Sequence, residues 1–184
     1  MMRIIAGTKR GKRLATLEGE DTRPTLERLK QALFSAIQFE LADRYVLDLF
    51  GGSGQLGLEA LSRGAAFCHF NDSNPAAVRI IQKNLQECGF EKDAKVTCTD
   101  YIMCVKMIER DMKRPDLVFL DPPYRKGLAE DALKRLTPLL AEGSLVAVES
   151  GSDEEFSFEG LALRKEYRQG TVKITLLEKR RTEE

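Results

Sequence analysis

The sequence predicts an α/β fold built on a mainly parallel sheet, and three observations support this prediction. Between residues 45 and 148, short apolar runs alternate regularly with amphipathic segments, which is the pattern of strands covered by helices on both faces. A glycine-rich loop, residues 51–57, separates the first apolar run from the helix that follows it. After residue 160, two extended runs follow each other without a helix between them, so the sheet should close with an antiparallel hairpin.

Each expected element follows from its own residue pattern. The first long helix opens at Pro24, which suits a first helical turn, and it carries Leu26, Leu29, Leu33 and Ile37 on one apolar face. The strands are expected at residues 45–50, 66–71, 94–98, 116–120, 144–148, 161–167 and 171–178. The helices are expected at residues 25–41, 55–63, 75–88, 101–110 and 129–140.

Residues 1–20 are expected to form a small basic β-hairpin arm with glycines at its turns. The chain as a whole is neutral, because Lys+Arg and Asp+Glu both number 29. A local basic patch of this kind is typical of contact with a nucleic-acid backbone, and a solvated surface is the alternative. Arg23, just before the first helix, could also reach a phosphate. The expected RNA-binding residues are Arg3, Lys9, Arg10, Lys12, Arg13 and Arg23.

The overall composition, 42% hydrophobic and 32% charged, is that of an ordinary globular protein. The cysteines form no CxxC pair and His69 has no partner at metal-ligand spacing, so no metal site is expected. Buried free thiols are typical of a reducing cytoplasm, where we expect this protein. No apolar run approaches the roughly 20 residues that span a membrane. The cysteines are Cys68, Cys88, Cys98 and Cys104.

The glycine loop between the first strand and its helix predicts a nucleotide cofactor. Gly52, Gly54 and Gly57 satisfy the GxGxxG pattern, in which glycines let the backbone approach a ligand closely. Asp72 ends the second expected strand, where an acid can accept both ribose hydroxyls of an adenosine. The pattern therefore indicates an adenosine-containing cofactor, with NAD as one candidate.

A second motif, Asp121-Pro122-Pro123-Tyr124, ends the fourth expected strand. Two prolines cannot continue a strand, so the chain must turn here. The acid and a proline carbonyl could accept hydrogen bonds from an amine, and the tyrosine ring could stack on a planar base. A strand-ending turn with a packed tyrosine is the alternative.

Four acids are expected at one edge of the sheet, because the carboxyl ends of parallel strands line the ligand crevice. These acids are Asp48, Asp72, Asp100 and Asp121. Asp48 could face a cationic methionine group and Asp100 could accept from an adenine amine, which favours S-adenosylmethionine over NAD. A helix N-cap is the alternative for each acid. The expected cofactor-binding residues are Asp48, Phe50, Gly51, Gly52, Gly54, Gly57, Asp72, Asp100 and Tyr101.

Six motifs lie along nearly the whole chain: RIIAG at residues 3–7, TRPT at 22–25, QALF at 31–34, LDLFGGSG at 47–54, LGLEALSRGA at 56–65 and DLVFLDPPY at 116–124. With these motifs the chain resembles the RsmD family, bacterial S-adenosylmethionine-dependent methyltransferases that modify a guanine N2 in 16S ribosomal RNA. The DPPY turn belongs to many amino-group methyltransferases, and the basic arm, TRPT and LSRGA narrow the resemblance to this family.

The resemblance implies a Rossmann-like class I methyltransferase domain over residues 21–184, following the arm at residues 1–20. It implies a seven-stranded sheet in the order 3-2-1-4-5-7-6 with strand seven antiparallel. It also implies a 16S ribosomal RNA substrate, which we expect within an assembling small subunit. Two positions depart from the family pattern: Gly51 stands where Ala is common, and Asp72 stands where the family more often has Glu.

The chemistry gives the DPPY turn a specific role. An exocyclic amine on a base must be held in line with the methyl group, and positioning supplies much of the acceleration. Asp121 and the Pro122 carbonyl would hold the amine, while Tyr124 would stack on a base taken out of its helix. Guanine offers adjacent N1–H and N2–H donors that a carboxylate can accept together, so Asp121 favours guanine.

Other classes stay open at this stage. A DNA or RNA methyltransferase acting on adenine N6 or cytosine N4 would use the same site, although the chain has little room for a separate DNA target-recognition domain. A protein amine or amide methyltransferase more often carries Asn where this chain has Asp121. A non-catalytic NAD-binding or RNA-binding module is the remaining alternative.

Overall fold

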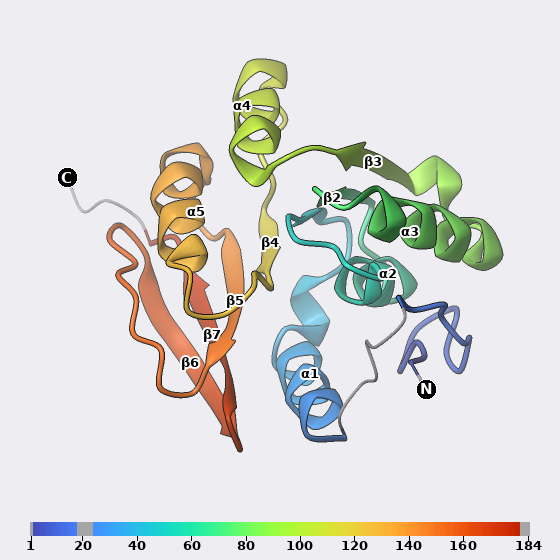
Figure 1. The fold of residues 1–184 in the computed structure, drawn as a ribbon, viewed down its shortest axis with the longest axis horizontal. Coiled ribbons are helices and arrows are strands. Elements are labelled where there is room, and N and C mark those ends of the chain that lie inside the picture. The colour runs from blue at the N-terminus through green and yellow to red at the C-terminus, as the bar shows by residue number, and fades with distance from the viewer. Residues whose placement is uncertain (1, 18–23, 181–184) are drawn as a thin grey trace.

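The computed structural model describes residues 2–17 and 24–180 of the chain, and its centre is a seven-stranded sheet (Figure 1). The strand order is β3-β2-β1-β4-β5-β7-β6, which confirms the expected order. The strands are β1 (Tyr45–Asp48), β2 (Phe67–Asp72), β3 (Ala94–Cys98), β4 (Leu117–Leu120), β5 (Leu145–Gly151), β6 (Ala162–Gln169) and β7 (Val172–Glu178).

The pairing directions also agree with the sequence pattern. β1 lies parallel to β2 and to β4, β2 lies parallel to β3, and β4 lies parallel to β5. β7 runs antiparallel to both β5 and β6, so the expected terminal hairpin is present. Because five neighbouring strands run in one direction, β3, β2, β1, β4 and β5 bring their carboxyl ends to the same edge of the sheet.

The helices lie close to their expected positions, with two changes at their ends. The α-helices are α1 (Pro24–Ala36), α2 (Gln55–Ser62), α3 (Pro75–Cys88), α4 (Tyr101–Asp111) and α5 (Leu128–Leu136). The first and last expected helices end early and continue as 3-10 turns, η1 (Gln38–Glu40) and η3 (Thr137–Leu139), and η2 (Glu91–Asp93) precedes β3. Pro138 explains η3, because proline lacks the N–H that the next helical hydrogen bond needs.

Both faces of the sheet are covered by helices (Figure 1). Alternate residues of one strand point to opposite faces, and β4 shows this clearly. Leu117 and Phe119 belong to the core that packs against α1, α2 and α3. Val118 and Leu120 belong to the core that packs against α4 and α5. The central strands are therefore rigidly held on both sides, and the loops at their ends have a fixed base.

The basic N-terminal segment is docked on the domain and forms less β-structure than expected. One antiparallel bridge joins Arg3 and Arg13, while Met2, Ile4 and Leu14 are buried in the core. Two further N–H groups of this segment donate to one carboxylate of α2: Ile5 N to Glu59 Oε2 at 2.7 Å and Ala6 N to Glu59 Oε1 at 3.0 Å. The two arms of the segment are also joined by backbone bonds from Ile4 N to Lys12 O at 2.9 Å and from Leu14 N to Met2 O at 3.0 Å. The domain boundary expected at residue 20 lies outside the described residues and stays a prediction.

The cysteines are free, as expected, and Cys68, Cys88 and Cys104 are buried while Cys98 is exposed. His69 is buried on β2, where its Nε2 lies 2.9 Å from the Thr97 hydroxyl. None of the helices in the described part of the chain is both long and apolar enough to cross a membrane.

Candidate active site

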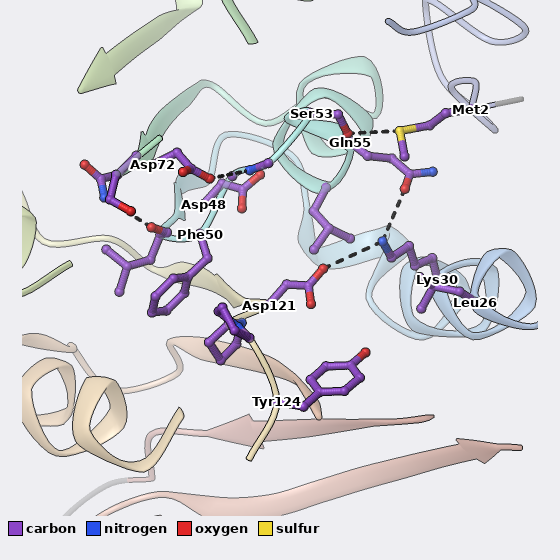
Figure 2. A pocket seen from close by; sticks show the side chains of 18 residues that line it. Met2, Leu26, Lys30, Asp48, Phe50, Ser53, Gln55, Asp72, Asp121 and Tyr124 are labelled. Atoms are coloured by element: carbon purple, nitrogen blue, oxygen red, sulfur yellow. Dashed lines mark hydrogen bonds and ion pairs between the residues drawn. The ribbon is translucent and has the colours of Figure 1, made fainter. Parts of the chain in front are cut away.

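A pocket of about 510 Å³ opens at the carboxyl ends of β1, β2 and β4 (Figure 2). The glycine loop and the end of β2 line one half of it, and the DPPY turn lines the other. Met2 and two residues of α1, Leu26 and Lys30, complete the wall. The topology therefore brings the two sequence motifs, which lie far apart in the chain, to one cavity.

The glycine loop is a tight turn stabilised by its own backbone. Gly54 donates its N–H to the Gly51 carbonyl at 2.6 Å, and Gly51 donates to the Asn71 carbonyl at 2.8 Å. Gly54 has a φ of 79° at the start of α2, a conformation that favours glycine. Gly51 and Gly52 line the pocket, whereas Gly54 and Gly57 do not. The loop therefore presents its backbone to the cavity near the first turn of α2.

Gly57 serves packing between α2 and β2. A Cβ atom at this position would lie 2.3 Å from Phe70 Cε1 and 2.6 Å from Cys68 Sγ, far inside van der Waals contact. Only glycine therefore lets α2 approach the sheet this closely. The Gly57 N–H donates to Asp48 Oδ2 at 3.1 Å, so the close packing also holds the carboxylate of Asp48 at the end of β1.

Asp48 is a buried acid with one oxygen unused. It is 1% exposed, and among the described residues its Oδ1 has no hydrogen-bond partner. Burial raises the pKa of Asp48 to about 7, because the charged form loses its hydration. An unpaired buried acceptor that lines a cavity needs a partner, and a cationic ligand would provide one. This is the observation by which the site fits S-adenosylmethionine, whose sulfonium and amino groups are positive.

Asp72 is held at the end of β2 by two backbone N–H groups. Its Oδ2 accepts from Gly52 at 2.8 Å and its Oδ1 accepts from Asn74 at 2.8 Å. Asn71, beside it, donates to the carbonyls of Leu49 and Thr99. The three strand ends are thus tied together, and the carboxylate of Asp72 stays fixed at the rim of the pocket.

Asp100 and Tyr101 lie outside the lining of this pocket. Asp100 caps α4, where its Oδ1 accepts from the Met103 N–H at 2.9 Å, which is the alternative use left open above. The Tyr101 hydroxyl donates to Asp131 Oδ2 at 2.6 Å, and its ring packs 5.5 Å from the ring of Phe50. Phe50 does line the pocket. Cofactor contacts of Asp100 and Tyr101 stay predictions.

The DPPY turn lies opposite the glycine loop (Figure 2). Pro122 is buried and Pro123 is exposed. The side chain of Asp121 is 31% exposed, and Tyr124 is 37% exposed. The Tyr124 hydroxyl donates to Glu149 Oε1 at 2.5 Å. Desolvation and the neighbouring Glu149 charge raise the pKa of Tyr124, so this hydroxyl acts as a donor to the carboxylate.

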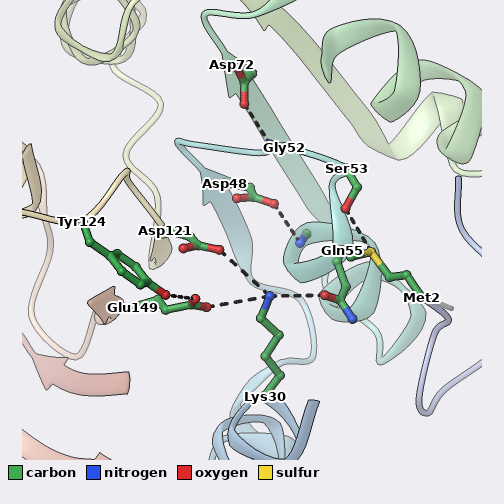
Figure 3. A network of polar contacts seen from close by, with 11 residues as sticks. Met2, Lys30, Asp48, Gly52, Ser53, Gln55, Asp72, Asp121, Tyr124 and Glu149 are labelled. Atoms are coloured by element: carbon green, nitrogen blue, oxygen red, sulfur yellow. Dashed lines mark hydrogen bonds and ion pairs between the residues drawn. The ribbon is translucent and has the colours of Figure 1, made fainter. Parts of the chain in front are cut away.

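A polar network that the sequence analysis did not identify lies beneath the turn (Figure 3). Lys30 Nζ lies 3.2 Å from Gln55 Oε1, 3.7 Å from Glu149 Oε2 and 4.0 Å from Asp121 Oδ2. Loss of hydration and the charge of Glu149 raise the pKa of Asp121, and the Lys30 ammonium opposes this rise. Two carboxylates therefore share one buried cation in the base half of the pocket.

Two sequence signals could have identified this network. Lys30 follows Leu26 by four residues and precedes Leu33 by three, so it lies on the apolar face of the first helix, where a lysine is unusual. Glu149 directly follows the expected fifth strand and therefore reaches the same edge of the sheet as the other acids. Gln55 gave no comparable signal.

The expected RNA-binding residues fall into three groups. Arg3, Arg10 and Arg13 are exposed. Lys9 and Lys12 contact the C-terminal part of α3 and the residues after it: the Lys9 ammonium lies 5.6 Å from the centre of the Phe90 ring, and Lys12 Nζ lies 3.8 Å from Glu87 Oε2. Arg23 lies outside the described residues.

The basic segment begins at the wall of the pocket. Met2 lines the cavity, and its sulfur accepts from the Ser53 hydroxyl at 3.0 Å. Backbone bonds from Thr8 and Lys9 to Ser62 then hold the segment along α2. The exposed arginines are therefore attached to the rigid helix that follows the glycine loop. Within the described residues, no group of three or more His, Cys, Asp or Glu side chains could hold a metal ion.

Comparison with known proteins places this arrangement in a family. The family model described as Conserved hypothetical protein 95 matches residues 2–178. Ribosomal RNA small subunit methyltransferase D of Haemophilus influenzae is 35% identical over 182 residues, covering 95% of this chain and 92% of that protein. The solved structure of yhhF from Escherichia coli has a TM-score of 0.84 and 31% identity, covering 98% of this chain and 99% of that chain.

A more distant structure shares the fold alone. It is an RNA methyltransferase from Salinibacter ruber in complex with S-adenosyl-L-homocysteine, with a TM-score of 0.67 and 15% identity over 88% of this chain and 97% of that chain. The nearer similarities extend over almost the full length of both partners. This chain therefore belongs to the RsmD family.

Proposed function

We propose that this protein transfers a methyl group from S-adenosylmethionine to the exocyclic N2 amine of a guanine in 16S ribosomal RNA. Family membership makes it an S-adenosylmethionine-dependent ribosomal RNA methyltransferase. The observation that carries the finer proposal is the composition of one pocket. Asp48 and Asp72 line its first half with the glycine loop, and Asp121, Pro122 and Tyr124 line the second.

The first half fits the cofactor. Gly51 and Gly52 leave the loop backbone open to the cavity, while Asp72, which the Gly52 N–H holds in place, would accept from ribose hydroxyls with its remaining lone pairs. The free Oδ1 of Asp48 is the acceptor for the positively charged methionine part. When bound, the cofactor supplies an electrophilic methyl group on a sulfonium.

The second half holds the base. Asp121 and the Pro122 carbonyl accept hydrogen bonds from the exocyclic amine, which turns the nitrogen lone pair towards the cofactor half of the pocket. Tyr124 supplies a ring face for stacking, and its hydroxyl bond to Glu149 fixes the position of that ring. These residues act by alignment, which supplies a large share of the rate when the reacting groups are held in near-attack geometry.

Asp121 also suits the proton balance of the reaction. Formation of the new N–C bond leaves a surplus proton on the nitrogen, and a carboxylate within hydrogen-bond reach can accept it. Limited hydration and the Glu149 charge raise the pKa of Asp121, which makes it a stronger base than an ordinary surface aspartate. The proton can then pass to solvent, because the side chain is 31% exposed.

The surroundings of the pocket suit an RNA substrate. The exposed Arg3, Arg10 and Arg13 belong to the segment that starts at the pocket wall, where they can contact phosphates on either side of an extruded base. The described part of the chain forms one sheet with its helices, and the RNA contacts proposed outside the pocket come from one short segment. We therefore expect the assembling small subunit to present the target base. We also place the enzyme in the cytoplasm.

Mapping methylated nucleotides in 16S ribosomal RNA tests the proposal. A strain lacking the protein should lose N2 methylation at one guanine, and wild-type protein should restore it while Asp121→Ala should not. Loss of a methyl group from adenine N6 or cytosine N4, or no loss at all, would overturn the guanine assignment. A parallel assay with labelled cofactor should show transfer to small-subunit RNA and none to duplex DNA.

A further inference from the structure

Lys30 is a buried cation in the base half of the pocket that the transfer chemistry described above does not use. It is 5% exposed, although a lysine is rarely buried unless its ammonium group is paired with an acid. Its Nζ stands at the centre of the polar network in Figure 3, directed towards Gln55, Glu149 and Asp121. A lysine in this position costs desolvation free energy, so a functional reason for it is worth testing.

The ammonium of Lys30 has donor capacity that its neighbours leave unused. A lysine carries three N–H donors. Among the described residues, only Gln55 Oε1, at 3.2 Å, lies within hydrogen-bond distance. The carboxylate oxygens of Glu149 and Asp121 lie at 3.7 Å and 4.0 Å, which is ion-pair range without a hydrogen bond. Lys30 also lines the pocket, so a ligand can reach its remaining donors.

Glu149 holds the other side of the network. Its Oε1 accepts from the Tyr124 hydroxyl, while its Oε2 is buried with no hydrogen-bond partner among the described residues and faces Lys30 at 3.7 Å. One carboxylate from β5 therefore orients both the stacking ring and the ammonium. The pocket wall consequently presents a fixed donor, Lys30, beside a fixed acceptor, Asp121, at a separation of 4.0 Å.

We propose that Lys30 donates a hydrogen bond to O6 of the target guanine while Asp121 accepts from the N1–H and N2–H edge. This inference rests on the guanine specificity proposed above. The guanine edge presents one acceptor, O6, next to two donors, which complements a lysine beside a carboxylate. Adenine carries an amine where guanine has O6, so its donor would face the Lys30 donor. A site built to hydrogen-bond a substrate group discriminates strongly against an analogue that cannot form this hydrogen bond.

A simpler role for Lys30 would be to neutralise the two carboxylates, Asp121 and Glu149. In that case Lys30 acts on the enzyme alone, and its removal should slow every substrate by the same factor. A contact with O6 instead makes the loss depend on the substrate. The ratio of rates for two substrates that differ only at position 6 of the base therefore separates the two roles.

The experiment compares guanosine with 6-thioguanosine at the mapped target position of 16S RNA, presented as the RNA fragment or reconstituted subunit that the wild-type enzyme methylates. The analogue keeps N1–H and the N2 amine but has sulfur, a weak acceptor, in place of O6. Wild-type enzyme should prefer guanosine by about 10–100-fold in single-turnover rate, as expected for a hydrogen bond from a charged donor. Lys30→Met should bring this preference to within about 3-fold.

Two further variants keep the result interpretable. Lys30→Arg retains a donor and should keep most of the preference, whereas Lys83→Met removes an exposed lysine on α3 and should change nothing. If Lys30→Met is too slow to follow, the ratio of dissociation constants for the two RNAs on the variant loaded with S-adenosylhomocysteine gives the same comparison. Calorimetry with S-adenosylhomocysteine checks that each variant is folded.

A preference that survives Lys30→Met unchanged would overturn this inference and leave guanine N2 methylation intact. Equal wild-type rates for guanosine and 6-thioguanosine would overturn it as well. A wild-type enzyme that places no methyl on N2 of the mapped guanine would instead overturn the proposed function.

Discussion

The two halves of the pocket are built in different ways. The cofactor half is built from the glycine loop and the ends of β1 and β2, where the backbone N–H groups of Gly57 and Gly52 hold Asp48 and Asp72 at 3.1 Å and 2.8 Å. The base half is assembled from side chains of α1, α2, β5 and the turn after β4, and Lys30, Asp121, Glu149 and Tyr124 contact one another there. A backbone cradle suits a ligand common to many enzymes, whereas a side-chain network can be altered to read one base.

The two halves of the pocket also differ in the charges that they contain. In the cofactor half, Asp48 Oδ1 has no hydrogen-bond partner among the described residues, so a cationic ligand can pair with it. The base half already contains a cation, Lys30, between Asp121 and Glu149. We therefore expect substitutions in the cofactor half to act mainly on cofactor affinity, and substitutions in the base half to act mainly on transfer.

Asp121→Ala should have the largest effect. It removes the carboxylate that holds the amine and accepts the proton, so transfer should fall about 10³-fold or more. Asp121→Asn keeps the shape of the side chain but loses its charge, so its transfer rate should lie between those of the wild type and Asp121→Ala. Single-turnover transfer of a labelled methyl group to the RNA measures both variants. An Asp121→Ala enzyme with nearly wild-type rate would remove this residue from the chemistry.

Two substitutions at Tyr124 distinguish the contribution of ring stacking from that of the hydroxyl bond to Glu149. Tyr124→Ala removes the ring and should lower kcat/KM by about 10–100-fold, the usual value of one base–aromatic stack. Tyr124→Phe keeps the ring and removes only its hydroxyl, so the expected loss is about 3–10-fold. Steady-state kinetics at fixed cofactor measure the two losses. Equal losses would mean that the hydroxyl, and not the ring face, matters.

The basic N-terminal segment should govern affinity for RNA without affecting the chemistry. Replacing Lys9, Arg10, Lys12 and Arg13 with Ala should weaken RNA binding about 10-fold at low salt and reduce the slope of log K against log salt by up to about 3. Lys134→Ala, on α5 and exposed, is the matched control and should leave the slope unchanged. An unchanged slope in the fourfold variant would mean that the segment is only a solvated surface.

The effect furthest from the transfer reaction is on stability. Burial raises the pKa of Asp48 from 3.8 to about 7, so the folded protein binds this proton more tightly than the unfolded chain. The stability that this proton contributes is therefore fully present below about pH 4 and is lost as the pH rises through about 7. Asp48→Asn avoids this loss, so it should be more stable by up to about 4 kcal/mol at about pH 8 and nearly equal at about pH 4.

Thermal unfolding of wild type and Asp48→Asn at both pH values measures the difference. The same variant should bind S-adenosylhomocysteine more weakly, because a neutral amide replaces the acceptor for the positively charged amino group. A variant that is less stable at the higher pH would show that the charged form of Asp48 is stabilised in the folded state.

Most of the fold follows from patterns that are local in sequence. The alternation of apolar strands with amphipathic helices predicts the parallel sheet, and the run without a helix after residue 160 predicts the hairpin of β6 and β7. Helix ends are less predictable, because the α-helix at α1 gives way to a 3-10 turn at Gln38 without a proline or glycine to mark it. The N-terminal segment pairs with itself as expected, since Ile4 N donates to Lys12 O and Leu14 N to Met2 O, but its additional bonds to Glu59 of α2 were not predicted.

The same distinction applies to the site. Asp72 and the glycine loop are recognisable because their residues are contiguous or end a strand. Asp100 shows the limit of that rule, since it closely follows the end of β3 and yet its carboxylate caps α4. Lys30 and Glu149 meet only through the tertiary fold, so their contact depends on the packing of α1 against the sheet, which sequence periodicity alone does not specify.

Calorimetry with S-adenosylhomocysteine on Asp72→Ala and Asp121→Ala tests the division of the pocket most directly. Both acids line the same cavity, but only Asp72 belongs to the cofactor half. We predict that Asp72→Ala weakens binding about 10–100-fold, as expected for lost hydrogen bonds to a charged acceptor, whereas Asp121→Ala changes the dissociation constant by less than about 3-fold. Equal weakening in both variants would contradict the division into a cofactor half and a base half.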